Sequence, residues 1–140
     1  MSTQDEKRLN PGQQSVLVLD DDPVIRELLE CRLAGAGWDV RTTGNGREAL
    51  EMWRSWRPRV VLLDRQMPIL DGVQVARRIR LGEAELGGSR SILVSISGSV
   101  LPYEREQLRW DGFDGFVPKP FCTQDLLRAL EGLLQGKIHP

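Results

Sequence analysis

The sequence predicts an α/β protein, a doubly wound five-stranded parallel sheet with helices on both faces. Two short runs, residues 16–19 and 60–63, are apolar at every position, which is typical of strands buried on both sides of a parallel sheet. From Ser15 onward, strand patterns and helix patterns alternate to give five strand–helix units. Right-handed crossovers limit how such units connect, and the strand order 2-1-3-4-5 satisfies this limit.

The strands are recognised as short runs rich in apolar residues. They are expected at about residues 15–20, 38–43, 60–64, 91–97 and 113–118. The second run alternates, with Asp39 and Arg41 facing outward, as suits a strand at the edge of a sheet. Pro118 has no N–H to donate to a neighbouring strand, so the fifth strand is predicted at the opposite edge. Both edges agree with the order 2-1-3-4-5.

The helices are recognised by start signals and by apolar residues at helical spacing. They are expected at about residues 23–35, 46–56, 72–81, 102–110 and 123–135. Asp22 as N-cap and Pro23 at the first helical position start the first helix. Asn45 and Glu48 form a capping-box pattern at the start of the second. The buried stripes of the first and last helices are expected to comprise Ile25, Leu28, Leu29, Leu33, Leu126, Leu127, Leu130, Leu133 and Leu134. Residues 82–90 are predicted to form a glycine-containing loop.

Length and composition indicate one globular domain. The chain has 140 residues, 40% of them hydrophobic and 28% charged. Residues 15–135 are expected to form the domain, between flexible tails at 1–14 and 136–140. The net charge of −1 argues against a direct nucleic-acid partner. No apolar stretch approaches the roughly 20 residues that span a bilayer, and the polar N-terminus is not a secretory signal. With only two cysteines, the protein is expected to be cytoplasmic and without a membrane partner.

Polar side chains follow four of the predicted strands at the end of the sheet where the strands finish. They are Asp20 and Asp21 after the first strand, Asp64 after the third, Ser97 after the fourth and Lys119 after the fifth. Open parallel sheets bind their ligands past the carboxyl ends of the strands, so we expect these side chains to form one site. Clustered carboxylates repel one another, and a divalent cation held by oxygen ligands would explain why they are placed together.

This set of side chains has the groups that phosphoryl transfer needs. Carboxylates can hold Mg²⁺, or Mn²⁺ in its place, and leave ligand positions for a phosphoryl oxygen. Lys119 is a point charge suited to the same phosphoryl group, the Ser97 hydroxyl can donate a hydrogen bond, and the backbone N–H of Gly98 is approachable. Asp64 is placed between the paired acids and the lysine, which makes it the natural nucleophile for a covalent acyl phosphate.

Four short motifs surround these side chains along the chain. They are Val18-Leu19-Asp20-Asp21-Asp22-Pro23, then Leu62-Leu63-Asp64-Arg65-Gln66-Met67-Pro68 with Asp71-Gly72, then Ile96-Ser97-Gly98, then Phe116-Val117-Pro118-Lys119-Pro120-Phe121. In this order they strongly resemble the CheY-like receiver domain of two-component response regulators, and the resemblance covers about residues 15–135. It implies a flavodoxin-like fold and a phosphoacceptor that modifies and dephosphorylates itself, with no turnover of a small molecule.

The resemblance also implies how the phosphoryl group arrives and which residues hold the metal. Asp64 would accept the group from a histidine kinase or a histidine phosphotransfer protein. Asp21, Asp64 and the backbone carbonyl of Gln66 would ligate Mg²⁺ directly, and Asp20 would act mainly through water. Asp22 is interpreted as an N-cap and not as a ligand.

The remaining implied roles concern the phosphoryl oxygens and the switch. Ser97, Lys119 and the backbone of Gly98 would contact the phosphoryl oxygens, as would the backbone of Arg65. Ser97 and Phe116 would form a conformational switch in which Phe116 is the rotating aromatic residue; a plain core role for Phe116 is the alternative. The peptide bond after Lys119 would be cis.

Two other functions are alternatives. Asp20-Asp21-Asp22-Pro23-Val24 fits the Asp-x-Asp-x-Val pattern of haloacid-dehalogenase-like phosphatases, in which Asp20 would be the nucleophile. A binding module that works without phosphorylation is the second. For a stand-alone receiver the output is expected to be contact with an unknown downstream protein, and a second copy of the chain is a further candidate partner.

Overall fold

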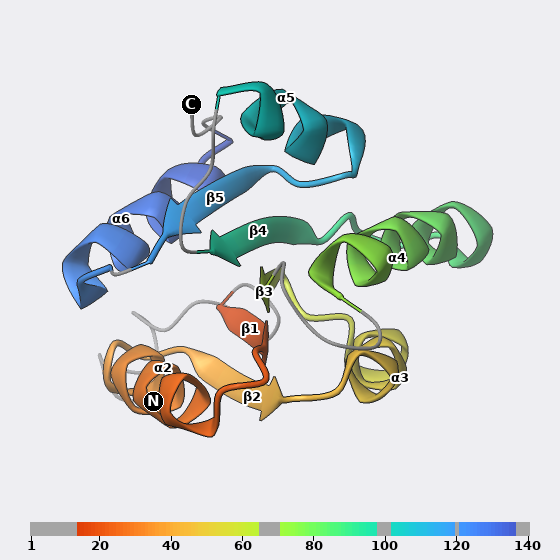
Figure 1. The fold of residues 1–140 in the computed structure, drawn as a ribbon. Helices are drawn as coiled ribbons and strands as arrows, with labels where there is room; N and C mark the ends of the chain where they lie inside the picture. The colour runs from red at the N-terminus through yellow and green to blue at the C-terminus, as the bar shows by residue number, and fades with distance from the viewer. Residues whose placement is uncertain (1–13, 65–70, 98–101, 120, 137–140) are drawn as a thin grey trace.

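The computed structural model describes residues 14–64, 71–97, 102–119 and 121–136, with the backbone alone for residues 97, 102, 103 and 105. It shows a five-stranded parallel sheet in the order β2-β1-β3-β4-β5 with helices on both faces, as the sequence predicts (Figure 1). The strands are β1 (Ser15–Leu19), β2 (Asp39–Thr43), β3 (Val60–Asp64), β4 (Ile92–Ser97) and β5 (Gly115–Pro118). The helices are α2 (Pro23–Gly35), α3 (Gly46–Trp56), α4 (Gly72–Leu86), α5 (Pro102–Trp110) and α6 (Thr123–Leu134).

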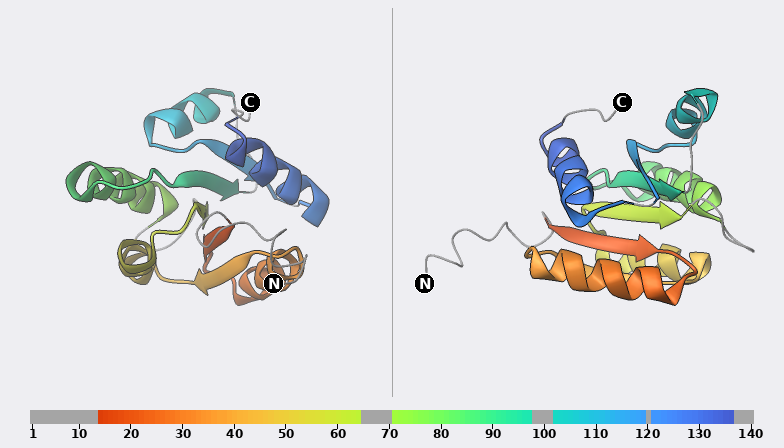
Figure 2. Two further views of the ribbon diagram at one scale, coloured as in Figure 1. Left: turned by 180° about the vertical axis from the view of Figure 1, so that it is seen from behind. Right: turned by 60° about the vertical axis from the view of Figure 1, so that its left-hand side comes forward.

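The helices form two layers, one on each face of the sheet (Figure 2). α2 and α6 cover one face, whereas α3, α4 and α5 cover the other. Successive side chains of a strand point to opposite faces, so each layer encloses its own apolar core. In β1, Val16 and Val18 pack against α2 and α6, and Leu17 and Leu19 pack against α3 and α4. All four side chains are fully buried, as expected for a strand in the middle of a doubly covered sheet.

Side-chain caps fix where the helices begin. Asp22 accepts a 2.9 Å hydrogen bond from the backbone N of Val24, which confirms it as the N-cap of α2. Asn45 caps α3 by accepting from two backbone amides. α4 begins with a complete capping box that the sequence analysis did not identify: Asp71 accepts from the backbone N of Gln74, and the side chain of Gln74 accepts from the backbone N of Asp71.

The loop predicted at residues 82–90 is wrong over its first part, because α4 continues to Leu86. Gly82 lies inside this helix against the ring of Trp53 in α3, and a Cβ atom at Gly82 would lie only 2.8 Å from the ring carbon Cζ3. The glycine therefore allows two helices to approach closely and does not end one. The helix ends instead at Gly87, whose φ of 73° lies in the region that favours glycine.

The stripe predicted for α2 is narrower than expected. Leu29 and Leu33 are buried and Ile25 packs against the same core, but Leu28 is 43% exposed. Neighbouring residues of a helix are turned by about 100°, so a stripe centred on Leu29 and Leu33 leaves Leu28 at its border. In α6 the predicted stripe is present, with Leu126, Leu130 and Leu133 buried and the other two leucines packed against the core.

An ion-pair cluster joins α4 to the start of β5. The guanidinium of Arg80 donates to four partners at 2.8–2.9 Å: the carbonyl oxygens of Ser91 and Gly112 and the carboxylates of Glu83 and Asp114. Asp114 also accepts from the backbone N of Leu93 at 2.8 Å. These bonds hold Asp114 in the turn before the strand, so β5 begins at Gly115, two residues later than predicted.

Apart from residues 14 and 136, the predicted tails lie outside the described residues, and their flexibility stays a prediction. Among the helices that the structure describes, none is long and apolar enough to cross a membrane.

Candidate functional site

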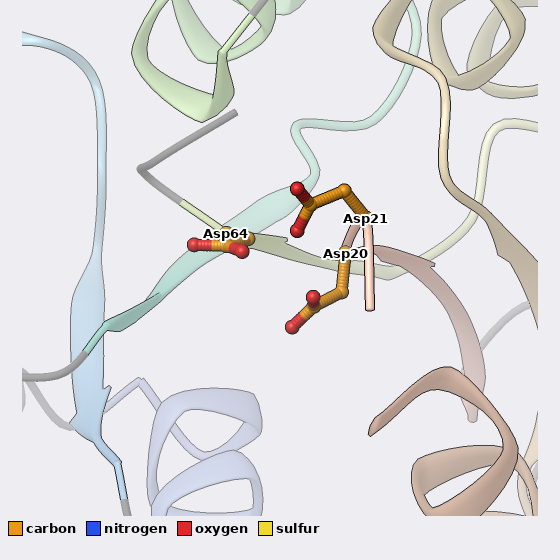
Figure 3. Close-up of side chains that lie close together, drawn as sticks. All are labelled: Asp20, Asp21 and Asp64. Carbon is orange, nitrogen blue, oxygen red and sulfur yellow. The ribbon is translucent and has the colours of Figure 1, made fainter. Parts of the chain in front are cut away.

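Three carboxylates meet where β1 and β3 end (Figure 3). The parallel register pairs Leu19 with Leu63, so the next residue of each strand, Asp20 or Asp64, is delivered to the same edge of the sheet. Asp21 follows directly, and each of the three aspartates offers a carboxylate oxygen within 4.8 Å of the others. The structure thus brings together the acids that the sequence predicts at this edge.

Asp20 is fully buried, and its backbone N and both of its carboxylate oxygens make hydrogen bonds. Its backbone N donates to the carbonyl oxygen of Thr43 at the end of β2, at 3.2 Å. Its Oδ1 accepts from the backbone N of Asp22 at 2.9 Å, and its Oδ2 accepts from Nζ of Lys119, also at 2.9 Å. Both carboxylate oxygens are therefore satisfied, as a buried charge requires.

Lys119 reaches the acids from the end of β5. Its Nζ lies 2.9 Å from Oδ2 of Asp20 and 3.7 Å from Oδ2 of Asp64, so one ammonium group pairs with two carboxylates. Burial alone would lower the pKa of Lys119, but the hydrogen bond to Asp20 and the charges of the three carboxylates outweigh it and raise the pKa above its usual value. The lysine is thus a fixed positive charge beside Asp64.

Asp64 is almost buried, at 6% exposure, and the start of α4 packs directly on its backbone. A Cβ atom at Gly72 would overlap the carbonyl oxygen of Asp64 and lie 3.2 Å from Cβ of Leu63. Only glycine allows this contact. Gly72 therefore sets the position of α4 relative to Asp64, a role that the motif with Asp71-Gly72 did not reveal in the sequence.

The donor set suits a hard divalent cation. Three carboxylates and one ammonium leave an excess of negative charge within a few ångströms, and oxygen is the ligand atom that Mg²⁺ and Mn²⁺ prefer. Like charges at this separation repel one another strongly where water is partly excluded. The residues present at the site fit a bound Mg²⁺ ion.

The structure describes only some of the residues predicted to hold the metal, to contact the phosphoryl group or to form the switch. Arg65, Gln66 and Gly98, the side chain of Ser97 and the peptide bond after Lys119 lie outside the described residues, and their roles stay predictions. Phe116 is described: it is 8% exposed and belongs to the core under α3, α4 and α5.

One contact beside the acids was missed by the sequence analysis. The guanidinium of Arg26 in α2 donates from Nη1 to the carbonyl oxygen of Asp20 at 2.7 Å. Gly44, just after β2, leaves space for this guanidinium. A basic residue six positions after Asp20 is a weak signal in the sequence, because an arginine on a surface helix usually points to solvent.

Comparison with known proteins decides the family. Residues 16–131 match the model of the response regulator receiver domain. The chain belongs to this family. Receiver domains of two-component systems accept phosphoryl groups from histidine kinases or histidine phosphotransfer proteins. The acidic cluster of this receiver domain lies at the carboxyl ends of the strands, where the strand pattern of the sequence predicts it.

The receiver domain is similar to both curated and solved relatives. It is 38% identical over 120 residues to the response regulator MprA of Mycolicibacterium vanbaalenii. The matched region covers 86% of this chain and 50% of that protein. The chain thus spans about half the length of the curated relatives that it matches.

Two solved structures share the fold closely. The receiver domain of the response regulator NarL from Mycobacterium tuberculosis is 30% identical, with a TM-score of 0.78 over 91% of this chain and 100% of that one. The receiver domain of a sensor histidine kinase from Pseudomonas aeruginosa, solved with a magnesium ion in its active-site cleft, is 27% identical, with a TM-score of 0.76 over 87% of this chain and 98% of that one.

Proposed function

We propose that this receiver domain accepts a phosphoryl group on Asp64 from the phosphohistidine of a sensor kinase or phosphotransfer protein. The observation that carries the proposal is the set of charges around Asp64. Two further carboxylates offer oxygens within 4.8 Å of its own, and Nζ of Lys119 lies 3.7 Å from its Oδ2. The family supplies the class of reaction, and this geometry supports the choice of residue.

The proposed transfer makes one bond and breaks one. A carboxylate oxygen of Asp64 attacks the phosphorus atom, and the P–N bond to the donor imidazole breaks. The imidazole nitrogen keeps the bonding electron pair and regains a proton from solvent. Lys119 already lies beside Asp64 and would pair with an oxygen of the transferred group.

Bound Mg²⁺, or Mn²⁺, would supply further positive charge for the phosphoryl oxygens. We propose that Asp20, Asp21, Asp64 and the carbonyl of Gln66 hold this ion. The backbone amides of Arg65 and Gly98 and the hydroxyl of Ser97 would complete the set of donors around the phosphoryl group.

Asp20 is a poorer nucleophile than Asp64. Its side chain is completely buried, and each of its carboxylate oxygens already accepts a hydrogen bond, one from the backbone N of Asp22 and one from Lys119. A phosphorus atom would have to reach these paired oxygens in a space that the surrounding residues already fill. This burial and pairing disfavour the phosphatase alternative, in which Asp20 would be the attacking residue.

We propose that phosphorylation is read by another protein, or by a second copy of the chain, through the surface around α5. Ser97 and Phe116 would couple the phosphorylated site to this surface, with Phe116 moving as the hydroxyl of Ser97 turns toward the phosphoryl group. The phosphoryl group would act by binding one of two conformations better than the other. Trp110, which is 81% exposed at the end of α5, is suited to a protein contact.

Acetyl phosphate tests this function without knowledge of the natural donor. In the presence of Mg²⁺, intact-mass spectrometry should show the addition of one phosphoryl group to the wild-type domain. The Asp22→Asn variant, which also lacks a carboxylate at this edge, should still be labelled. Labelling that persists in Asp64→Asn, or that continues undiminished in EDTA, would contradict the proposal; a domain that is never labelled but binds its partner would favour the phosphorylation-independent module.

A further inference from the structure

We propose that Arg26 is a positioning residue that holds the exposed aspartate Asp21 in place for the metal. The inference rests on the proposed metal-dependent phosphoacceptor function and adds a residue outside the acidic cluster. Asp21 is the only exposed member of the three carboxylates that meet at the site. An exposed side chain on a connecting segment needs its backbone fixed if its carboxylate is to stay near two buried ones.

Arg26 bonds to the residues on both sides of Asp21. Its side-chain Nη1 donates to the carbonyl oxygen of Asp20 at 2.7 Å, and its backbone N donates to the carbonyl oxygen of Asp22 at 3.1 Å. The first bond orients the peptide group that joins Asp20 to Asp21. The second bond belongs to the first turn of α2 and connects Arg26 to Asp22, the residue after Asp21. Arg26 thus brackets Asp21.

Gly44 makes this arrangement sterically possible. A Cβ atom at Gly44 would overlap Nη1 of Arg26 and lie 3.2 Å from its Cζ, and 3.5 Å from the carbonyl oxygen of Asp20. The guanidinium therefore occupies the space that a side chain at the end of β2 would take. The hydrogen bond from Arg26 to the carbonyl oxygen of Asp20 therefore requires that residue 44 has no side chain. A substitution at Gly44 can disturb this bond without changing Arg26 itself.

Charge and positioning predict opposite effects of removing Arg26. A guanidinium near three carboxylates opposes a divalent cation by simple repulsion, so its loss would tighten Mg²⁺ binding if charge dominated. If the arginine instead orients Asp21, its loss frees the peptide after Asp20 and weakens binding. The sign of the change in the Mg²⁺ dissociation constant therefore separates the two roles.

The experiment is a Mg²⁺ titration in which the NMR signals of the backbone amides of Asp21 and Asp22 report binding. We expect Arg26→Ala to raise the Mg²⁺ dissociation constant about three- to tenfold, less than the full value of one hydrogen bond from a charged donor, because the bond acts on Asp21 only through the backbone. Arg26→Lys keeps the charge and a donor and should recover part of the affinity. Arg32→Ala removes an exposed charge from the last turn of the same helix and should bind Mg²⁺ as wild type does.

Gly44→Ala is the second variant and leaves every polar group in place. The atoms that its Cβ meets first belong to the flexible end of the arginine, so the domain should fold while the guanidinium is displaced. We expect the same direction and a similar size of effect on Mg²⁺ binding as in Arg26→Ala. In the double variant the two effects should not add, because both act through one hydrogen bond.

The outcomes separate this inference from the proposed function. If the wild-type domain binds no Mg²⁺, the proposed function itself is wrong. If the wild type binds Mg²⁺ but Arg26→Ala binds it equally well or more tightly, Arg26 does not position Asp21. Additive effects of Gly44→Ala and Arg26→Ala would also overturn the inference, because they would show that Gly44 acts by another route.

Discussion

Asp21→Asn is expected to stabilise the metal-free domain and, at the same time, to weaken its binding of Mg²⁺. Asp21 contributes one of three carboxylates with oxygens within 4.8 Å of one another. Lys119 lies within 4.0 Å of Asp20 and Asp64, the two buried members of the cluster. Replacing the exposed member removes repulsion and leaves those two ion pairs intact.

The size of the stabilisation follows from the separation of the charges. Two unit charges 4.8 Å apart repel each other by about 1 kcal/mol in water and by roughly 3–4 kcal/mol at an effective dielectric constant of 20. Asp21 is exposed, so the value in water is the better guide, and the ammonium of Lys119 offsets part of the remaining negative charge. We therefore expect the free energy of unfolding of the metal-free variant to rise by about 1 kcal/mol, or Tm by roughly 3–5 °C.

Urea unfolding in EDTA and in saturating Mg²⁺ measures both effects. Asp22→Asn is the matched control, because it removes the same charge at the next residue and keeps the N-cap of α2, a position where Asn and Asp are equivalent. We expect the Mg²⁺ dissociation constant to rise by at least about tenfold in Asp21→Asn, a change of 1.4 kcal/mol, and to change little in the control. Equal losses of Mg²⁺ affinity in both variants would refute the three-carboxylate site. A metal-free Asp21→Asn variant that is no more stable than wild type would also refute it.

Three further predictions concern the fold and the switch. Gly82→Ala should lower the free energy of unfolding by about 1–3 kcal/mol, because its Cβ would overlap a buried indole ring. Gly132→Ala, at an open position of α6, should raise it by up to about 1 kcal/mol, and urea unfolding measures both variants. Arg80→Ala should cost about 3 kcal/mol in the same assay, because it removes the cation that pairs with the partly buried carboxylate of Glu83 and leaves Asp114 with Arg90 alone. Ser97→Ala should still be phosphorylated, but the amide shifts that beryllofluoride induces over residues 103–116 should shrink; shifts as large as in wild type would show that Ser97 does not couple the site to this surface.

The strand order and the acidic cluster could be predicted because they depend on local patterns. Buried runs identify β1 and β3, and the proline at the end of β5 places that strand at an edge. In a parallel sheet, residues that follow neighbouring strands must meet at one edge. That rule brings Asp20 and Asp64 together, and it places Lys119 at the same end of the sheet, two strands from Asp64. The structure shows Nζ of Lys119 within ion-pair distance of both carboxylates.

Several missed features depend on how neighbouring elements pack against one another. Gly82 looks like a helix end until Trp53 of the neighbouring helix is seen against it. Arg26 and Arg80 look like ordinary surface arginines of amphipathic helices, yet each donates to backbone carbonyls of other segments. Such contacts are set by how the helices pack on the sheet, and helical periodicity does not specify them.

The most direct test of the central claim is to locate the phosphoryl group on the chain. After reaction with acetyl phosphate and Mg²⁺, borohydride reduction converts a phosphorylated aspartate to homoserine, and tandem mass spectrometry of the resulting peptides identifies the position. We predict homoserine at residue 64 alone, because part of the Asp64 side chain is accessible, whereas the side chain of Asp20 is completely buried. Homoserine at residue 20, or an unmodified residue 64 in a labelled and folded protein, would contradict the account.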